Sequence, residues 1–544
     1  MMGELSPMAV VKEVPYRTQN WTLSKPMASG RNGIVVSQNR EAAEAGAAIL
    51  EAGGNAADAA VAACFALAAV EPWNSGLGGI GFAVVLKANE TTAKVVDFGP
   101  VAPRRADPAD YPLTGEMKKD LFTWPEVVGD VNIHGPLSFV IPSSVAGYAA
   151  LKESFGTAMP VAELLAPAIA LAKRGLAQDW YTTLKVSSSA AVLRLYEESA
   201  RIYLPNGLPP VPPYQGKPGF VRLGNLASTL ERLASAGLDD FYHGELAGRL
   251  AADIKAMGGV VDAEDLAGCR AVIRDAPTID WRGTHLVHTA GGLTAAPTLE
   301  AVVEGMAADK PAPHGPDADW FATLSRVMRQ AYASRLEGLG AAQSASGSAA
   351  KEPGDTCTTH LTVVDGDGTL VSVTTTLLSS MGSRVVLPDT GVLMNNGMMW
   401  FDPRPGSANA IAPGARPLCN MCPVIVTPKD GSWPRYAGGS SGGRRILASV
   451  YQMLAWTVDC EFGLETAAHL PRIDVSGPDQ TSADLRLPAD TLAALEAVGP
   501  LDVVEHGVLP INFACPNLIR VDRDGAEGIS DVISPWSAAV AAKG

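Results

Sequence analysis

Apolar residues recur with helical spacing in several parts of the chain. Residues 40–71 predict two alanine-rich helices separated at Gly53, Gly54 and Asn55, and residues 143–175 and 224–258 also have helical spacing. The longest uninterrupted apolar run, Ala59–Val70, is too short to span a bilayer and is typical of a buried helix. A further helix is indicated by apolar residues that fall on one face: Trp320, Leu324, Val327, Met328 and Ala331.

Strand patterns occur on both sides of a stretch that has the composition of a linker. Phe82–Leu86 and Ala93–Phe98 predict a strand pair. Residues 340–357, GAAQSASGSAAKEPGDTC, are small, polar and non-periodic, which favours a linker. Directly after them, TTHLTVVDGDGTLVSVTTT has two β-branched runs around an Asp-Gly-Asp-Gly turn, so a hairpin is expected.

The position of the turn predicts which residues of this hairpin face each other. If Asp367 lies at its centre, paired residues have numbers that sum to 734, and Thr358 faces Thr376 with Cβ atoms about 5 Å apart. Farther along, Trp433–Ala437 is expected to be a strand that leads into a glycine-rich turn at 438–443. A helix should follow, with its apolar side formed by Ile446, Leu447, Val450 and Leu454.

Composition and charge restrict the class of protein. The 544 residues are 47% hydrophobic and 18% charged, as in a folded globular protein. The net charge of −15 argues against a nucleic-acid partner, because phosphates require a basic face. The first residues lack a basic start followed by an apolar segment, so we expect no secretory signal, no membrane partner and a cytoplasmic location.

The seven cysteines are scattered, so a disulfide framework is not expected. Cys419 and Cys422 form one C-x-x-C pair, but no second ligand pair follows at the spacing of a zinc site. We therefore interpret both as core residues. No metal and no organic cofactor is expected.

Thr358 is the candidate for covalent chemistry. A threonine hydroxyl is a poor nucleophile unless a base lies beside it, and a threonine at a chain terminus has such a base in its own α-amine. That amine titrates near pH 7.7–8.0, which suits general-base work. A flexible linker that ends at a threonine opening a buried strand is the arrangement that release by cleavage requires. The alternative is that Thr358 only initiates a strand.

Several motifs, in order, resemble the γ-glutamyltransferase family of N-terminal-nucleophile hydrolases. TTHLTVVDGDGTLVSVTTTL resembles the start of the family's small subunit, and GIVVSQNREAAEAGAAILEAGGNAADAAVA and NSGLGGIGF resemble its N-terminal helices and glycine turn. ARPLCNMCPVIV and GGSSGGRRILASV are similar in position and shape to later family segments. The resemblance covers nearly all of residues 33–534 and implies an α+β fold, a four-layer αββα sandwich.

The resemblance also implies roles for individual residues. Thr358 would be the nucleophile and Cys357–Thr358 the bond that is cut, giving a large segment 1–357 and a small segment 358–544 that form one globular heterodimer. Thr376 would hydrogen-bond the nucleophile. Gly442 and Gly443 would supply an oxyanion hole through their N–H groups, ahead of a helix N-terminus. His360 is interpreted as a structural strand residue.

The chain departs from the family where relatives hold the γ-glutamyl group. Gly99 stands where the family has a carboxylate-binding arginine, and Met399 stands where it has an ammonium-binding aspartate. Other expected substrate-binding positions also differ: Leu378, Trp400, Cys419 and Asn420. Each lost charged hydrogen bond is worth about 1.5–3 kcal/mol. We therefore expect a small-molecule amide whose acyl part is not γ-glutamyl.

Two alternatives remain open at this point. The chain could be a conventional γ-glutamyl hydrolase or transpeptidase with an unfamiliar pocket, or an uncut, inactive scaffold. Arg384 and Arg444 could supply a relocated carboxylate contact, although a structural role is favoured for both. A higher homo-oligomer is also left open.

Overall fold

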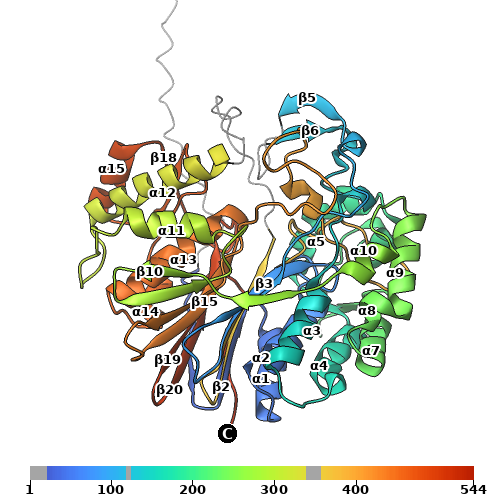
Figure 1. Cartoon of the computed structure of the whole chain (residues 1–544), viewed down its shortest axis with the longest axis horizontal. Coiled ribbons are helices and arrows are strands. Elements are labelled where there is room, and N and C mark those ends of the chain that lie inside the picture. Colours follow the sequence, from blue (N-terminus) through green and yellow to red (C-terminus); the bar gives the residue numbers. More distant parts are fainter. Residues whose placement is uncertain (1–20, 118–123, 339–356) are drawn as a thin grey trace, which may run out of the picture.

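The computed structural model describes residues 21–117, 124–338 and 357–544. Two seven-stranded antiparallel sheets lie face to face between two sets of helices (Figure 1). The expected four-layer αββα sandwich is therefore confirmed. No helix in the described ranges is long and apolar enough to cross a membrane.

The first sheet contains, in spatial order, β1 (Ala28–Gly30), β20 (Gly525–Ser530), β19 (Cys515–Asp522), β15 (Arg435–Ser441), β14 (Val424–Pro428), β11 (His285–Thr289) and β10 (Thr278–Trp281). The second sheet contains β21 (Ala538–Ala541), β2 (Gly33–Ser37), β12 (Thr359–Asp365), β13 (Leu370–Thr376), β3 (Ile80–Leu86), β4 (Lys94–Phe98) and β9 (Val272–Asp275). Each sheet thus combines strands from before and after residue 358.

Helices on the outer side of the second sheet come from the first part of the chain (Figure 1, right). They are α1 (Arg40–Glu51), α2 (Ala56–Val70), α3 (Ser144–Phe155), α4 (Val161–Arg174), α5 (Trp180–Leu193), α6 (Glu197–Tyr203), α7 (Leu226–Ala236), α8 (Asp240–His243), α9 (Glu245–Ala256) and α10 (Ala263–Gly268). The helices on the other side are α11 (Ala296–Gly305), α12 (Ala318–Gly338), α13 (Ile446–Leu454), α14 (Leu464–His469) and α15 (Ala489–Val498).

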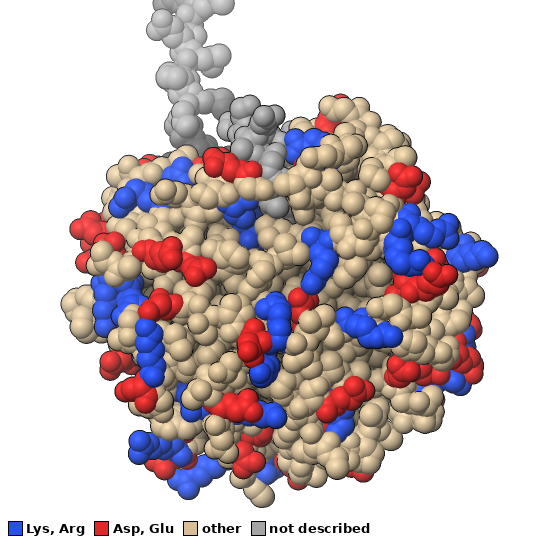
Figure 2. Space-filling model, viewed as in Figure 1, with Lys and Arg blue, Asp and Glu red and all other residues tan. Residues whose placement is uncertain are grey.

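Short strands complete the structure outside the two large sheets. Three of them, β16 (Ile473–Asp474), β17 (Thr481–Asp484) and β18 (Leu501–Val504), form one small sheet. Two further pairs are β5 (Leu113–Met117) with β6 (Pro125–Val127), and β7 (Leu176–Ala177) with β8 (Phe220–Val221). On the face shown in Figure 2, acidic and basic side chains are interspersed rather than gathered by sign.

The sheets are covered by helices on one face and by each other on the opposite face because their central strands are apolar on both faces. In β2, Val35 packs into the core beneath the helices, whereas Ile34 and Val36 pack between the two sheets. Side chains alternate across a strand, so a continuous apolar run has a buried partner on each side. The predicted break between α1 and α2 is confirmed. There Asn55 caps α2, and Asp58 closes the capping box.

The predicted glycine turn at 438–443 is wrong in its first four residues, because β15 continues to Ser441. A Cβ atom on Gly439 would lie 2.3 Å from the His360 ring, so this strand needs glycine for the close approach of the other sheet. His360 is fully buried, and its ring nitrogens are hydrogen-bonded to the hydroxyls of Thr374 and Thr362. Burial lowers the pKa of His360 to about 3. This placement agrees with a neutral, structural histidine.

Candidate active site

The hairpin has the register that the turn predicts. Thr359 pairs with Thr375 and His360 with Thr374, so the residue numbers sum to 734 along the ladder. Thr358, one residue ahead of β12, lies with its Oγ1 3.3 Å from Oγ1 of Thr376, the last residue of β13. Local β-branched runs and an Asp-Gly turn predict the register that brings these two hydroxyls together.

Both hydroxyls converge on the carbonyl group of Cys357. Thr358 Oγ1 lies 2.5 Å from that carbonyl oxygen, and Thr376 Oγ1 lies 2.7 Å from it. The Thr376 oxygen also accepts a hydrogen bond of 2.8 Å from the Leu378 N–H. The Leu378 donor therefore fixes the Thr376 hydroxyl so that its proton points to the carbonyl oxygen. This geometry suits attack on the Cys357–Thr358 bond, with stabilisation of the charge that develops on oxygen.

Gly442 and Gly443 lie where β15 turns into α13. Their φ values are +135° and +61°, which L residues rarely adopt, and a Cβ atom on Gly442 would be 3.0 Å from Cα of Ala514. Gly442 lines the same cavity as Thr358. The first N–H groups of a helical segment have no intrahelical acceptor, so they are available to an oxyanion. The structure thus places Gly442 in the lining of the cavity that Thr358 also lines, with Gly443 next in the turn, and their role as an oxyanion hole stays a prediction.

A polar network connects the start of β12 to the neighbouring sheet. The Thr359 hydroxyl donates to Glu71 Oε2 at 2.6 Å and approaches Gln38 Oε1 at 3.2 Å, and Gln38 donates to the Ser441 hydroxyl. Asn74 donates to Glu71 Oε1 at 2.6 Å. Burial raises the pKa of Glu71 to about 7, against the opposing effect of these hydrogen bonds.

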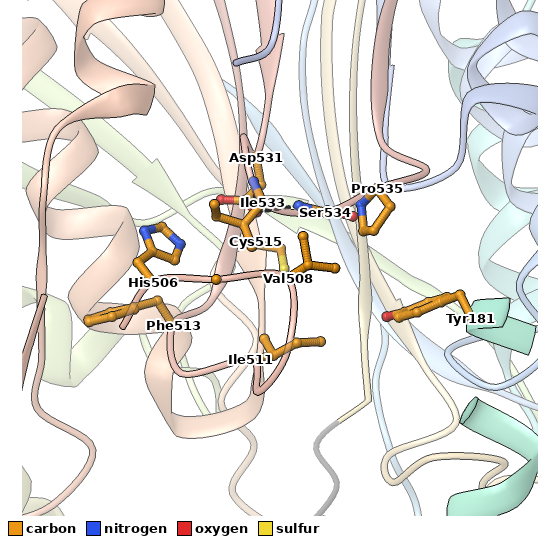
Figure 3. Close-up of a pocket in the computed structure, with 11 residues that line it drawn as sticks. Tyr181, His506, Val508, Ile511, Phe513, Cys515, Asp531, Ile533, Ser534 and Pro535 are labelled. Carbon is orange, nitrogen blue, oxygen red and sulfur yellow. Dashed lines mark hydrogen bonds between the residues drawn. The ribbon is translucent and has the colours of Figure 1, made fainter. Parts of the chain in front are cut away.

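A cavity of about 270 Å³ opens beside Thr358. Tyr181, Lys185 and the loop 509–513 form its walls, and a much smaller cavity adjoins it behind Ile511 and Phe513. Figure 3 shows the residues that line the smaller cavity, with Tyr181 on one side and Ile511 on the loop opposite. Asp531 also lines the smaller cavity, and it accepts hydrogen bonds from the N–H groups of Ile533 and Ser534.

The expected substrate-binding residues do not line this larger cavity. Leu378, Met399, Trp400 and Cys419 belong to one buried apolar cluster. Trp400 and Asn420 also line a separate cavity of about 20 Å³ together with Arg444. None of these residues, nor Gly99, is among those that line the larger cavity beside Thr358. Their role in binding substrate stays a prediction.

The surroundings of Gly99 explain why no large side chain stands there. A Cβ atom at this position would lie 2.3 Å from the Phe82 ring and 2.6 Å from Nη2 of Arg416. Arg416 is held by Asp97 through an ion pair of 2.6 Å. The space that an arginine at position 99 would need is therefore filled by Phe82 and by a guanidinium that already has a carboxylate partner.

Arg384 and Arg444 differ in their surroundings. Arg384 has a φ of +62° and donates to Ser379 Oγ and Gly382 O at 2.8 and 2.6 Å, which indicates a structural role. Arg444 is buried, and its carbonyl accepts a hydrogen bond from Tyr332. The C-x-x-C residues Cys419 and Cys422 are buried free thiols.

Most of the residues that line the larger cavity were not predicted from the sequence. Gln38, Glu71, Lys185 and Arg445 line it, and they come from three distant parts of the chain. The one available signal was Glu71, an acid that directly follows a fifteen-residue helix whose residues are all buried.

The comparisons with known proteins agree with this architecture. The chain matches the gamma-glutamyltranspeptidase family over residues 42–350 and 341–541. It is 31% identical to the glutathione hydrolase proenzyme of Escherichia coli (strain K12), over 86% of this chain and 85% of that one. It is 32% identical to the acylase ACY 1 proenzyme of Pseudomonas sp. (strain V22), over 85% and 86% of the two chains.

The fold also matches solved structures over almost the whole chain. The cephalosporin acylase from Bacillus halodurans superposes with a TM-score of 0.80 at 24% identity, covering 98% of this chain and 99% of that one. This likeness concerns the fold, whereas the family match rests on sequence. The chain therefore belongs to the gamma-glutamyltranspeptidase family of N-terminal-nucleophile hydrolases and is an enzyme of the amidohydrolase type.

Proposed function

We propose that the chain is a self-processing amidase that uses Thr358 as its nucleophile, first on its own Cys357–Thr358 bond and then on a substrate that is not a γ-glutamyl amide. The observation that carries this proposal is the convergence of the Thr358 and Thr376 hydroxyls on the Cys357 carbonyl oxygen, at 2.5 and 2.7 Å. If Thr358 only initiated a strand, the Thr376 hydroxyl would not need to contact the carbonyl oxygen of Cys357.

In the first reaction, Thr358 Oγ adds to the carbonyl carbon of Cys357. The hydroxyl of Thr376 stabilises the negative charge on the carbonyl oxygen. The C–N bond then breaks, and its nitrogen takes the proton that the Thr358 hydroxyl gave up and becomes the α-amine of Thr358. Water hydrolyses the resulting ester, which leaves a carboxylate on Cys357 and a free N-terminal threonine.

In the second reaction, the new α-amine accepts the Thr358 hydroxyl proton while Oγ attacks the substrate carbonyl. The N–H groups of Gly442 and Gly443 stabilise the oxyanion. The ammonium returns its proton to the leaving amine, and water then hydrolyses the acyl-threonine ester. The two fragments stay together as a heterodimer because each sheet contains strands of both.

The proposal of a non-γ-glutamyl substrate is supported by the residues at the positions where the resemblance to the family predicts the γ-glutamyl contacts. Leu378, Met399 and Trp400 are buried in an apolar cluster, and Phe82 and Arg416 fill the space beside Gly99. A zwitterionic group would lose charged hydrogen bonds there, each worth about 1.5–3 kcal/mol.

The first test is a denaturing gel of the purified protein with N-terminal sequencing of each fragment. We expect two bands, the smaller beginning TTHLTVV, and one intact band for Thr358→Ala. Thr358→Ser, which keeps a hydroxyl, should still be cut. Intact wild-type protein would instead support the uncut scaffold.

The second test compares γ-glutamyl-p-nitroanilide with simple acyl p-nitroanilides. The names of the relatives include both a glutathione hydrolase and an acylase, so the hypothesis of a conventional γ-glutamyl enzyme needs its own measurement. We expect simple acyl anilides to have the higher kcat/KM. A higher value for the γ-glutamyl compound would contradict the proposed substrate class.

A further inference from the structure

The turn that follows α2 contacts residues on both sides of the proposed cut. Cys357 is buried, and its Sγ is in contact with the carbonyl oxygen of Trp73 and with Oδ1 of Asn74. On the other side, the hydroxyl of Thr359 donates a hydrogen bond of 2.6 Å to Oε2 of Glu71. The residue before the proposed cut and the second residue after it are therefore held by one short segment of the chain.

This turn has a fixed position relative to the Thr376 hydroxyl. The N–H of Leu377, which directly follows Thr376, donates to the carbonyl oxygen of Asn74 at 2.9 Å. The N–H of Met381 donates to the carbonyl oxygen of Trp73 at 3.0 Å. The turn also continues directly from α2, whose residues are all buried. The backbone that contacts the flanks of the cut is thus bound to the segment that carries the hydroxyl facing the scissile carbonyl.

Glu71 links the two contacts. Its Oε1 accepts a hydrogen bond of 2.6 Å from Nδ2 of Asn74, and its Oε2 accepts the one from Thr359. An amide that donates to a carboxylate through Nδ2 has its Oδ1 turned away from it, because the flipped amide would bring two acceptors together. Glu71 therefore fixes the orientation in which Asn74 presents Oδ1 to the Cys357 thiol.

We propose that Glu71 is a positioning residue for self-cleavage: through its two hydrogen-bond partners it holds the residues on both sides of the proposed cut, so that the bond stays within reach of the Thr358 hydroxyl. The inference rests on the proposed self-processing reaction. Thr358 Oγ1 lies 2.5 Å from the carbonyl oxygen of Cys357, so a shift of either flank changes its approach to the carbonyl carbon. A displacement of about 1 Å can slow a reaction about a hundredfold.

The rate of self-cleavage of newly synthesised chain tests this role. Samples of a cell-free translation at pH 8 are taken over time and separated on a denaturing gel. Burial raises the pKa of Glu71 to about 7, so at pH 8 both carboxylate oxygens can accept. Glu71→Gln leaves one acceptor oxygen in place of two, and we expect cleavage to slow by about ten- to a hundredfold. Asn74→Leu, which removes the amide, should also slow cleavage.

Asp58→Asn is the matched control. Asp58 is a buried carboxylate at the other end of α2, where it accepts hydrogen bonds from the N–H groups of Asn55 and Thr157 at 3.2 and 2.9 Å. Like Glu71→Gln, this substitution replaces a buried carboxylate with an amide of the same shape. It should lower stability without moving the groups around the cut, so we expect the folded variant to be cut at close to the wild-type rate.

A mutant cycle separates positioning from a purely structural role. Cys357→Ala removes the thiol that Asn74 contacts but keeps the bond that is cut. If Asn74 acts through that thiol, Asn74→Leu should slow cleavage less in the Cys357→Ala chain than in the wild-type chain. A general weakening of the fold by Asn74→Leu would slow both chains by the same factor.

The outcomes that overturn the inference are distinct from failure of the proposed function. Cleavage of Glu71→Gln at the wild-type rate would overturn it, as would equal slowing of Glu71→Gln and Asp58→Asn. If Glu71→Gln does not fold, the mutant cycle decides, and an equal factor for Asn74→Leu in both backgrounds overturns the inference. All these results leave self-cleavage of the wild-type chain in place. If the wild-type chain is not cut, the proposed self-processing fails, and this inference fails with it.

Discussion

The Thr376 hydroxyl offers the sharpest test of self-cleavage. Thr376→Val keeps the shape of the side chain but removes the donor that lies 2.7 Å from the Cys357 carbonyl oxygen. Removing one oxyanion donor typically slows a reaction by about 10²–10³-fold, or about 2.7–4 kcal/mol. We expect self-cleavage of the variant to slow by this factor, while Thr376→Ser remains close to wild type.

The rate is measured by cell-free translation, with samples taken over time and separated on a denaturing gel. Thr376→Val also leaves the buried Leu378 N–H without its acceptor, which costs about 1–3 kcal/mol of stability. Thr362→Val controls for that effect, because it removes a buried hydroxyl of the same hairpin, bonded to His360 at 3.0 Å. Cleavage of Thr376→Val at the rate of wild type and Thr362→Val would refute the assigned role.

Three further predictions concern pH and packing. The pKa of Glu71 is raised, so the unfolded chain loses this proton near pH 4.5 and the folded chain loses it near pH 7. The stability of the folded chain therefore falls as the pH rises from about 4.5 to about 7. In the uncut Thr358→Ala chain, Glu71→Gln should flatten this fall, as measured by denaturant titrations at pH 4 and 8. The kcat/KM for an acyl anilide should rise with pH through about 7.7–8.0, because the Thr358 α-amine must be unprotonated; a flat profile would exclude it as the base. Gly439→Ala should lower stability by about 1–3 kcal/mol in urea unfolding, because its Cβ would lie 2.3 Å from the His360 ring.

Gly248→Ala is the control for the packing prediction. Gly248 lies within α9, and a methyl group there would meet no neighbouring side chain or other segment within 4 Å, so alanine should raise stability by about 0.5–1 kcal/mol. Equal effects at Gly439 and Gly248 would mean that close packing of the sheets is not what requires glycine. For Glu71→Gln, a parallel pH dependence in variant and parent would show that another group titrates.

Patterns that depend on neighbours in sequence were predictable. The register of the hairpin that places Thr358 opposite Thr376 follows from strand periodicity and an Asp-Gly turn, and the structure confirms it. The break between α1 and α2 follows from Gly53, Gly54 and Asn55, with Asn55 as the cap.

Features that depend on the approach of distant elements were not predictable in this way. Gly439 stands in a glycine-rich run that is typical of a turn, but it lies in a strand. Glycine is needed there because His360 of the other sheet occupies the space that a side chain would fill. Lys185 and Arg445 reach the same cavity from segments that are far apart in sequence. The local periodicity of the sequence does not indicate that two such distant residues line the same cavity.

The interleaving of strands has a consequence for folding. β12 begins just after Thr358 and pairs on one side with β2, and β13 pairs with β3, so strands on opposite sides of the proposed cut are neighbours in one ladder. Before the cut, refolding is a first-order process whose rate does not depend on protein concentration. After the cut, unfolding releases two separate polypeptides, and recovery becomes a second-order encounter that dilution slows. The uncut chain is then the unit that folds, and the cut enzyme should survive by unfolding slowly rather than by refolding.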